Sequence, residues 1–263
     1  MELTIQEMQN KQLEILRIFV DACEKNNISY LLCAGNALGA IRHGGPIPWD
    51  PDTDILVPEN QINKLCECMI PELAPDYTVS YHLLGDKSNL IFPRIIIVGH
   101  ESTFFHIDIF RLVGLPDNKE EQERMYKSAS LIIKILELKE RSILSIESSA
   151  AYKSAIKVLL KLPLIAIPYG LLLRRYNKLC SKYPYDEAPY AGYLSGKYGT
   201  RNMFKREMFE EYITVDYAGI AVRIVKEYDF YLRQLYGDYM RLPSQEEQES
   251  WMKKIFIVKG KKG

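Results

Sequence analysis

Three aspartates at alternate positions are the first residues in this sequence whose types and spacing suggest chemistry. Asp50, Asp52 and Asp54 run directly into the apolar stretch 55–57, which is typical of a strand. Side chains two positions apart in a strand point to the same face, so Asp52 and Asp54 should project together. Carboxylates that close repel each other unless one is protonated or a cation lies between them, and Mg²⁺ prefers carboxylate and phosphate oxygens. An aspartate-rich turn that caps a strand is the alternative interpretation.

A third carboxylate, Asp108, lies inside an apolar, strand-like run of the chain. Burying an unpaired carboxylate there is costly, so Asp108 must meet a metal ion, a cation or hydrogen-bond donors. It could join Asp52 and Asp54 around a metal ion, or it could form an ion pair with Arg94 or Arg111. The residues alone leave these two solutions equal.

Gly35 and Asn36 lie between a predicted strand and a predicted short helix over 36–42. Backbone N–H groups at the start of a helix attract anions, and a glycine lets a phosphate approach the main chain. Arg42 follows two helical turns later and could hold a phosphate through paired hydrogen bonds. An ordinary turn and a solvated arginine are the alternatives.

The elements that must position these residues alternate between helix and strand. Thr4 and Glu7 form a capping box, and apolar residues at helical spacing follow it as far as Cys23. Further helices are predicted over 36–42, 58–73 and 228–240, and the block 119–183 is mostly helical. Strands are predicted over 28–33, 53–57, 77–83, 91–98 and 103–110, with a hairpin over 211–222. This mixture predicts an α+β fold.

The composition sets limits on the partners of the chain. Hydrophobic residues make up 47 % of the 263 positions, and 34 basic residues balance 34 acidic ones. No overall field therefore attracts nucleic acid, which we do not expect as a partner. The five cysteines indicate reduced, buried thiols, and the pattern of the first residues leads us to expect no secretory signal.

The stretch 155–173 is the most apolar part of the sequence, although lysines and prolines interrupt it. Its uninterrupted part is too short to span a bilayer. A buried pair of helices is the preferred interpretation. The alternative is a surface that contacts a membrane peripherally.

Several motifs in order resemble the LicD family, which includes bacterial phosphocholine transferases and is related to fukutin-type proteins. The family pattern has Thr or Ser where Asn36 stands, and Asp where Pro51 stands. The resemblance covers about residues 10–115 and 190–245. It is carried by GNALGAIR at 35–42, PWDPDTD at 48–54, HIDIF at 106–110, GKYG at 196–199 and the segment 228–243.

This resemblance implies a nucleotidyltransferase-like mixed β-sheet flanked by helices. The catalytic core would span 1–118, a helical insertion 119–185, and a C-terminal part over 186–263 would complete the domain. The implied activity moves an alcohol phosphate, phosphocholine first, from a CDP-alcohol such as CDP-choline to a glycan hydroxyl and releases CMP. The acceptor would be a cell-surface polysaccharide, teichoic acid or lipopolysaccharide. Both a free and a lipid-linked glycan are open as acceptors. The chain would then be cytoplasmic, and in the alternative interpretation of 155–173 this stretch would contact the inner face of the membrane peripherally.

The resemblance also implies which residues act. Asp52, Asp54 and Asp108 would be catalytic and hold Mg²⁺ or Mn²⁺, with Asp108 either a ligand or the general base for the acceptor hydroxyl. Trp49 would stack on the base or face a quaternary ammonium, unless it packs under the aspartate loop. The predicted substrate-binding residues are Gly35, Asn36, Arg42, Trp49, Asp50 and Lys205, although a solvated role for Lys205 is equally open.

Two other functions fit the same fold. A nucleotidyltransferase would move a nucleoside monophosphate from a nucleoside triphosphate to a small acceptor and release pyrophosphate. A non-catalytic relative would only bind a nucleotide or a partner, although the presence of all three acidic positions speaks against this.

Overall fold

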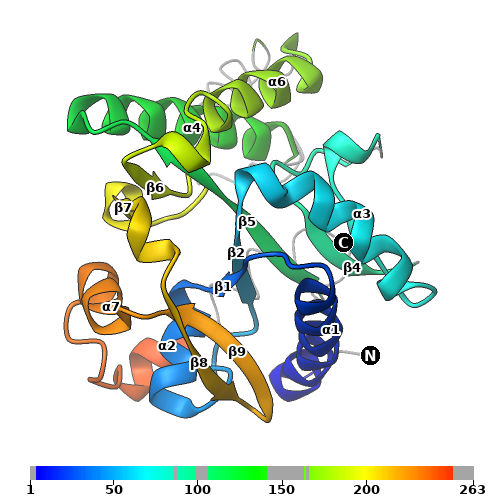
Figure 1. The fold of residues 1–263 in the computed structure, drawn as a ribbon, viewed down its shortest axis with the longest axis vertical. Helices are drawn as coiled ribbons and strands as arrows, with labels where there is room; N and C mark the ends of the chain where they lie inside the picture. The colour runs from blue at the N-terminus through cyan, green and yellow to red at the C-terminus, as the bar shows by residue number, and fades with distance from the viewer. Residues whose placement is uncertain (1–3, 86–87, 99–105, 141–162, 164–165, 251–263) are drawn as a thin grey trace, which may run out of the picture.

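The computed structural model describes residues 4–85, 88–98, 106–140, 163 and 166–250. Within them, a mixed sheet lies at the centre and helices pack around it (Figure 1). This confirms the predicted α+β class. The main strand order is β1-β2-β5-β4-β3, and β5 also pairs with β6, which pairs with β7. The strands are β1 (Leu31–Leu32), β2 (Thr53–Pro58), β3 (Tyr77–Ser80), β4 (Arg94–Ile97), β5 (His106–Leu115), β6 (Tyr190–Gly192) and β7 (Phe204–Lys205).

Strand β5 is the central element of the sheet. Its first half pairs in parallel with β2 and antiparallel with β4, and its second half pairs with β6. The register places Asp54 of β2 directly opposite Asp108, and Asp108 directly opposite Arg94 of β4. Three residues that are far apart in sequence therefore form one row across neighbouring strands.

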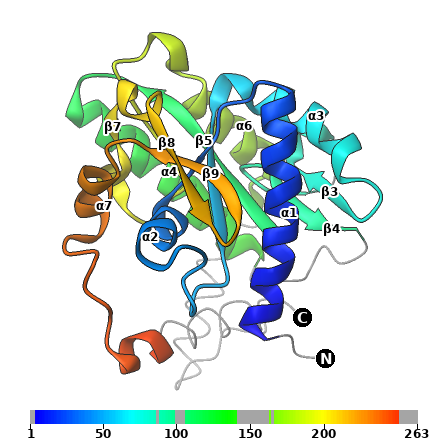
Figure 2. The ribbon, with the colours of Figure 1, turned by 60° about the horizontal axis from the view of Figure 1, so that its bottom comes forward.

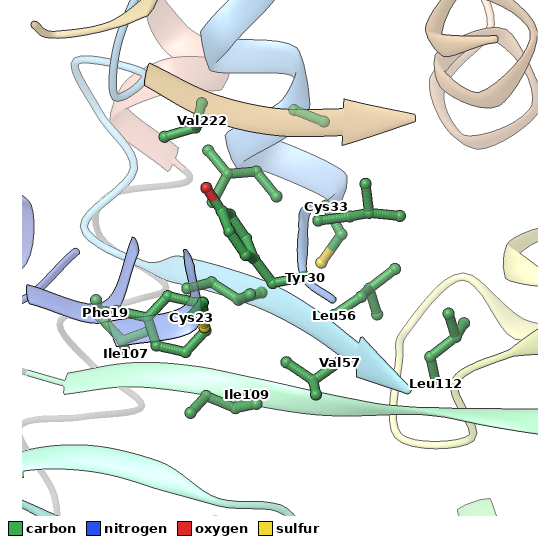
Figure 3. Packing of buried hydrophobic residues seen from close by; sticks show 14 of the residues in the cluster. Phe19, Cys23, Tyr30, Cys33, Leu56, Val57, Ile107, Ile109, Leu112 and Val222 are labelled. Atoms are coloured by element: carbon green, nitrogen blue, oxygen red, sulfur yellow. The ribbon is translucent and has the colours of Figure 1, made fainter. Parts of the chain in front are cut away.

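Helix α1 (Ile5–Lys25) begins at the predicted capping box, in which Glu7 N–H donates to the Thr4 hydroxyl and the Glu7 carboxylate accepts from Thr4 N–H. Its apolar face is buried against the sheet beside α3 (Ile62–Leu73). Figure 2 shows α1 running along the sheet, with α2 (Ala34–His43) and the hairpin of β8 (Tyr212–Tyr217) and β9 (Ile220–Val225) nearby. Figure 3 shows Phe19 of α1 packing over Ile107 and Ile109 of β5.

A second apolar core lies at the other end of β5. There α4 (Lys119–Glu140) and α6 (Tyr169–Cys180) pack against Val113 and Leu115 (Figure 1). Most of the stretch 155–173, including its proposed membrane contact, lies outside the described residues. Leu172 and Leu173, at its end, are buried in this core. None of the helices among the described residues has the length and apolar character needed to cross a membrane.

The C-terminal part begins with the predicted hairpin, formed by β8 (Tyr212–Tyr217) and β9 (Ile220–Val225). Helix α7 (Tyr228–Tyr236) follows and stops before Gly237, whose φ of 72° suits a glycine, so the helix is shorter than predicted. The strand predicted over 28–33 is also shorter, because only Leu31 and Leu32 pair with β2. Short 3₁₀ helices lie at Glu59–Gln61, His82–Leu84, Tyr185–Glu187, Gly199–Asn202 and Arg206–Phe209.

The five cysteines are free thiols, as predicted. Four of them are buried, and Cys68 is partly exposed. Cys23 lies in the main core beside Phe19, whose ring meets the Tyr30 ring edge-on at 5.5 Å (Figure 3). These thiols therefore belong to the packing of the core.

Candidate active site

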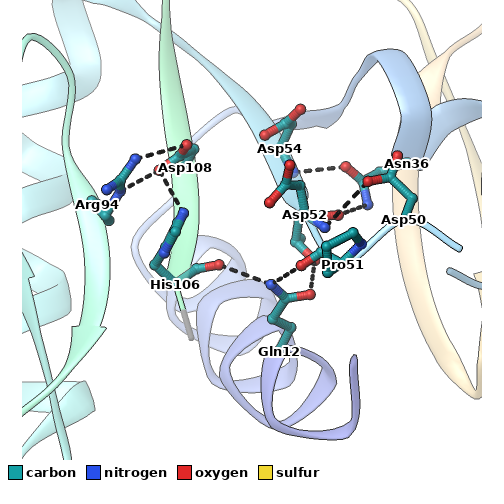
Figure 4. A network of polar contacts seen from close by, with 10 residues as sticks. Gln12, Asn36, Asp50, Pro51, Asp52, Asp54, Arg94, His106 and Asp108 are labelled. Carbon is teal, nitrogen blue, oxygen red and sulfur yellow. Dashed lines mark hydrogen bonds and ion pairs between the residues drawn. The ribbon is translucent and has the colours of Figure 1, made fainter. Parts of the chain in front are cut away.

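A cavity among the described residues has a volume of about 710 Å³ and opens beside the first halves of β2 and β5. Cavities of this size suit small-molecule substrates. Asp50, Asp52, Asp54 and Asp108 all line it. The parallel pairing of β2 with β5 causes this convergence, because it sets Asp54 and Asp108 side by side. Figure 4 shows the four carboxylates gathered along these two strands and the loop before β2.

The Asp54 carboxylate is disfavoured in its ionised form by burial and by the negative charges around it. Burial raises its pKa well above the ordinary value, and the neighbouring charges of Asp52, Asp108 and Asp50 raise it further. Lys197 acts in the opposite direction. Such a carboxylate favours either a proton or an added cation. A positive charge near Asp54 would therefore stabilise its ionised form.

Asp108 is held by an arginine. Arg94 donates to it through Nε at 2.5 Å and through Nη2 at 3.1 Å, and His106 Nε2 lies 3.8 Å from its Oδ1 (Figure 4). Of the two solutions left open by the sequence, the ion pair with Arg94 is the one present here. The other candidate, Arg111, pairs with Glu59 instead. The role of Asp108 as a metal ligand or general base stays a prediction.

The fit of a divalent cation can be judged from the donors. Within the described ranges, no three His, Cys, Asp or Glu side chains are grouped so that they could hold a metal ion. These side chains do not form a ready-made cage of three carboxylates, and Arg94 donates to both oxygens of Asp108, each of which keeps a further lone pair. The role of Asp108 as a third ligand stays a prediction. Asp52 and Asp54 still fit Mg²⁺, which commonly binds one or two carboxylates and completes its shell with substrate phosphates and water.

The glycine at position 35 has a clear steric reason. A Cβ atom on Gly35 would lie 2.9 Å from Asp50 Oδ2, so a larger residue would require the Asp50 carboxylate to move away from the start of α2. Gly35 and Asp50 both line the cavity, as predicted for substrate-binding residues. Whether they contact a phosphate stays a prediction.

Asn36 lies elsewhere than predicted. It is 5 % exposed and is not among the residues that line the cavity. Its Oδ1 accepts the Asp54 N–H at 2.7 Å, and its Nδ2 donates to Asp52 O at 3.1 Å and to the Tyr217 hydroxyl at 3.0 Å. Helix α2 begins two residues earlier, at Ala34, so Asn36 is not its cap. The side chain supports the aspartate loop from behind and does not face a ligand.

Arg42 and Trp49 line the cavity at its outer end. The Arg42 Cζ lies 6.0 Å from the Trp49 ring centre, and Nη1 donates to Tyr239 O at 2.7 Å. Burial lowers the pKa of Arg42. Arg42 thus links α2 to the segment after α7, and one face of Trp49 is near a cation.

The comparisons with known proteins agree with this geometry. The family model described as LicD/FKTN/FKRP, nucleotidyltransferase domain, matches residues 27–135, which hold all four aspartates. Over this part the chain is similar to the LicD family. It is 28 % identical to the lipopolysaccharide cholinephosphotransferase LicD of Haemophilus influenzae, over 94 % of this chain and 96 % of that protein. An uncharacterized protein of Rickettsia prowazekii is 40 % identical over 27 % of this chain and 28 % of its own length.

The similarity over nearly the full chain supports a transferase. Two of its lysines lie differently with respect to the cavity. Lys205 is exposed on β7 and does not line the cavity. Lys197, in the turn between β6 and β7, does line it and lowers the pKa of Asp54. The motif GKYG at 196–199 was the sequence signal for this lysine. Residues 196–198 of the segment between these strands line the cavity, whereas Lys205 pairs with Tyr190 of β6.

Aromatic side chains form another wall of the cavity. The sequence did not indicate this aromatic wall. Phe110 stacks on Tyr193 with ring centres 5.2 Å apart and planes 7° from parallel. The hydroxyls of Tyr198 and Tyr236 are hydrogen-bonded at 2.6 Å. The helical spacing of α7 indicated core packing, and Tyr231 is indeed buried, but Tyr236 lines the cavity.

Proposed function

We propose that this chain transfers phosphocholine from CDP-choline to a glycan hydroxyl and releases CMP. The observation that carries the proposal is the row of Asp54 and Asp108 across β2 and β5, beside Asp52, in a cavity of suitable size. The similarity to the Haemophilus influenzae cholinephosphotransferase supports it, because that similarity extends over nearly the full length of both chains.

In the proposed reaction the hydroxyl oxygen of the acceptor forms a bond to the phosphorus that carries choline. The bond from that phosphorus to the CMP oxygen breaks, and the hydroxyl proton leaves. Such a transfer depends mainly on positioning and on neutralising charge. Asp108 is our candidate for accepting the proton, and Arg94 fixes where its carboxylate lies. Lys197 is placed to offset negative charge near Asp54.

Asp52 and Asp54 would hold Mg²⁺ or Mn²⁺. When bound, this ion would supply positive charge to the donor phosphates and to the departing CMP. The raised pKa of Asp54 supports this assignment, because burial and then the negative charges of its neighbours disfavour the ionised carboxylate, which a bound cation would stabilise.

The lining of the cavity supports choline as the alcohol. Among the described lining residues, six are acidic (Asp50, Asp52, Asp54, Asp108, Asp238 and Glu247) and three are basic (Arg42, Lys197 and Arg241). Six more are aromatic: Trp49, Phe110, Tyr193, Tyr198, Tyr236 and Tyr239. Quaternary ammonium groups bind to aromatic faces and are attracted by nearby carboxylates, whereas a neutral polyol gains less from either.

We infer that the acceptor is the glycan of a lipopolysaccharide or a comparable lipid-linked glycan. The relative from Haemophilus influenzae carries lipopolysaccharide in its name. Such an acceptor would bring the chain to the inner face of the membrane.

The proposal is tested by incubating the purified chain with a panel of CDP-alcohols, a lipopolysaccharide acceptor and Mg²⁺ or Mn²⁺, and measuring CMP. We expect CDP-choline to be the preferred donor and Asp54→Asn to lower the rate by about a thousandfold, the size of effect seen when charge stabilisation is removed from an active site. Asp21→Asn, an exposed aspartate on α1, is the matched control. CMP release by Asp54→Asn at the wild-type rate would refute the proposal. Pyrophosphate release from a nucleoside triphosphate would favour the nucleotidyltransferase alternative.

A further inference from the structure

Two buried glutamines on α1 lie directly behind the aspartates of the cavity. Gln9 and Gln12 are one helical turn apart and are 5 % and 3 % exposed. A buried amide must satisfy its donors and its acceptor, so its partners show what it holds in place. We call this pair the glutamine clamp.

Gln12 contacts both strands that carry the acidic side chains. Its Nε2 donates to Pro51 O at 2.6 Å and to His106 O at 3.2 Å, and its Oε1 accepts from the Thr53 hydroxyl at 3.1 Å (Figure 4). These three bonds use both donors and the acceptor of one amide. A single side chain therefore joins the start of β2 to the start of β5.

The partners of Gln12 are neighbours of all three aspartates. Pro51 precedes Asp52, Thr53 separates Asp52 from Asp54, and His106 lies two residues before Asp108. Thr53 and Ile107 are the first paired residues of β2 and β5, so the clamp acts where the two strands begin to pair.

Gln9 holds the loop that leads into β2. Its Nε2 donates to Ile47 O and to Asp50 O, both at 2.9 Å. Gln9 therefore fixes the backbone of Asp50, whereas Gln12 fixes the spacing between the two strands. Both side chains are uncharged, so they position the carboxylates without changing the net charge of the acidic site.

We propose that Gln12 is a positioning residue for the transfer reaction, which sets how far Asp108 lies from Asp52 and Asp54. This inference rests on the proposed function. Partners behind the residues that carry the chemistry commonly change activity by about 10- to 100-fold when they are removed, and small misplacements of reacting groups have effects of similar size. The clamp acts from a helix whose own residues, Gln9 and Gln12, do not line the cavity.

The test compares Gln12→Met with Gln6→Met. Methionine keeps a long unbranched side chain but removes the three hydrogen bonds of Gln12. Gln6 is exposed on the same helix, and its amide donates to Asn10 Oδ1. We expect Gln12→Met to lower kcat for CMP release by about 10- to 100-fold while KM for CDP-choline stays within about threefold. A purely structural role would lower the thermal midpoint and leave kcat of the folded protein unchanged.

Hydrogen–deuterium exchange of the metal-free protein gives a second readout that needs no substrate. Backbone amides in 50–55 and 106–109 should exchange faster in Gln12→Met than in Gln6→Met. If the two variants match in exchange and in kcat, the inference is wrong. If Gln12→Met does not fold, Thr53→Val is the variant to measure, since it removes only one hydrogen bond of the clamp. Faster exchange at 50–55 together with a lower kcat would support the inference. Wild-type exchange and a wild-type kcat would overturn it. A wild-type chain that releases no CMP would refute the proposed function, and the exchange result would still decide whether the clamp fixes these strands.

Discussion

Two arginine–carboxylate ion pairs include residues of β5 that are three positions apart, Asp108 and Arg111. The two pairs differ in their surroundings. Asp108 pairs with Arg94, and the two side chains are 16 % and 26 % exposed at the cavity. Arg111 pairs with Glu59 through two bonds of 2.7 and 2.6 Å, and its side chain is only 3 % exposed. Positions three apart lie on opposite faces of a strand, so the two pairs point to opposite sides of the sheet.

The surroundings of Arg111 are those of a structural pair. It also donates to Asn177 Oδ1 of α6 at 2.5 Å, and the rings of Tyr81 and Tyr176 lie 6.0 and 5.8 Å from its Cζ. Burial acts to lower the pKa of Arg111, but the hydrogen bonds to Glu59 together with the electrostatic effects of Cys180, Tyr81 and Glu59 outweigh it, and the pKa is raised. The same pairing chemistry thus ties α6 to the sheet on one face and presents a carboxylate to a cavity on the other.

Removing the charge at the cavity should affect the reaction much more than the fold. We expect Asp108→Asn to lower the rate of CMP release by about 100-fold or more, as is typical when a group that handles the proton is lost. The thermal midpoint should move by less than about 3 °C, because Arg94 is partly exposed and can be solvated. Steady-state kinetics and calorimetry measure the two effects. A wild-type rate of CMP release in Asp108→Asn would show that the Asp108 carboxylate does not act in the reaction.

Removing the charge at the other pair should have the opposite pattern. Glu59→Gln leaves the buried Arg111 without its counter-charge, and we expect the free energy of unfolding to fall by about 3 kcal/mol. CMP release per folded molecule should stay at the wild-type level, because Glu59 does not line the cavity. Urea unfolding provides the measurement, with Glu123→Gln as an exposed control on α4. An unchanged unfolding midpoint in Glu59→Gln would contradict the structural role of this pair.

Asp54 extends the comparison, because none of the ion pairs among the described residues includes it. Its pKa is raised in the folded chain, so the folded state binds its proton more tightly than the unfolded state does. The ionised side chain therefore opposes folding, and stability contributed by this group is lost as the pH rises through the folded pKa. We expect Asp54→Asn to raise the thermal midpoint of the metal-free protein by a few degrees, about 1 kcal/mol, at neutral pH.

This gain should shrink on acidification to about pH 4, where the native Asp54 carries a proton and is already neutral. Added Mg²⁺ or Mn²⁺ should stabilise the wild-type chain more than the variant. A lower thermal midpoint for Asp54→Asn at neutral pH would show that the carboxylate is stabilised in the fold.

Local rules explain the parts of the fold that the sequence predicted well. The capping box at Thr4 and Glu7, the period of two at Asp52 and Asp54, and the hairpin at 211–222 depend on neighbours within a few positions. The motifs at 35–54 and 106–110 were also sufficient to indicate the family. Helix and strand ends were less accurate, as at α7, where Gly237 stops the helix earlier.

The parts that were missed involve contacts between distant segments. Asn36 was expected to face a phosphate, but Tyr217 and the Asp52–Asp54 backbone hold it inside the fold. The sequence left Lys205 open between a substrate contact and a solvated position, and Lys197 is the lysine that lines the cavity. Nothing in the local pattern distinguishes the buried amide of Gln12 from the exposed amide of Gln6.

By itself, the sequence indicated the similarity to the LicD family, the α+β class and the set of acidic side chains, because these follow from residue types and short spacings. Only the tertiary structure decided that Arg94 holds Asp108, that Lys197 faces Asp54 and that Gln12 joins the two strands. The physical reason is the register of β2 against β5 and of β5 against β4. A shift of that register by one residue would turn a row of side chains to the other face of the sheet, and no local signal fixes it.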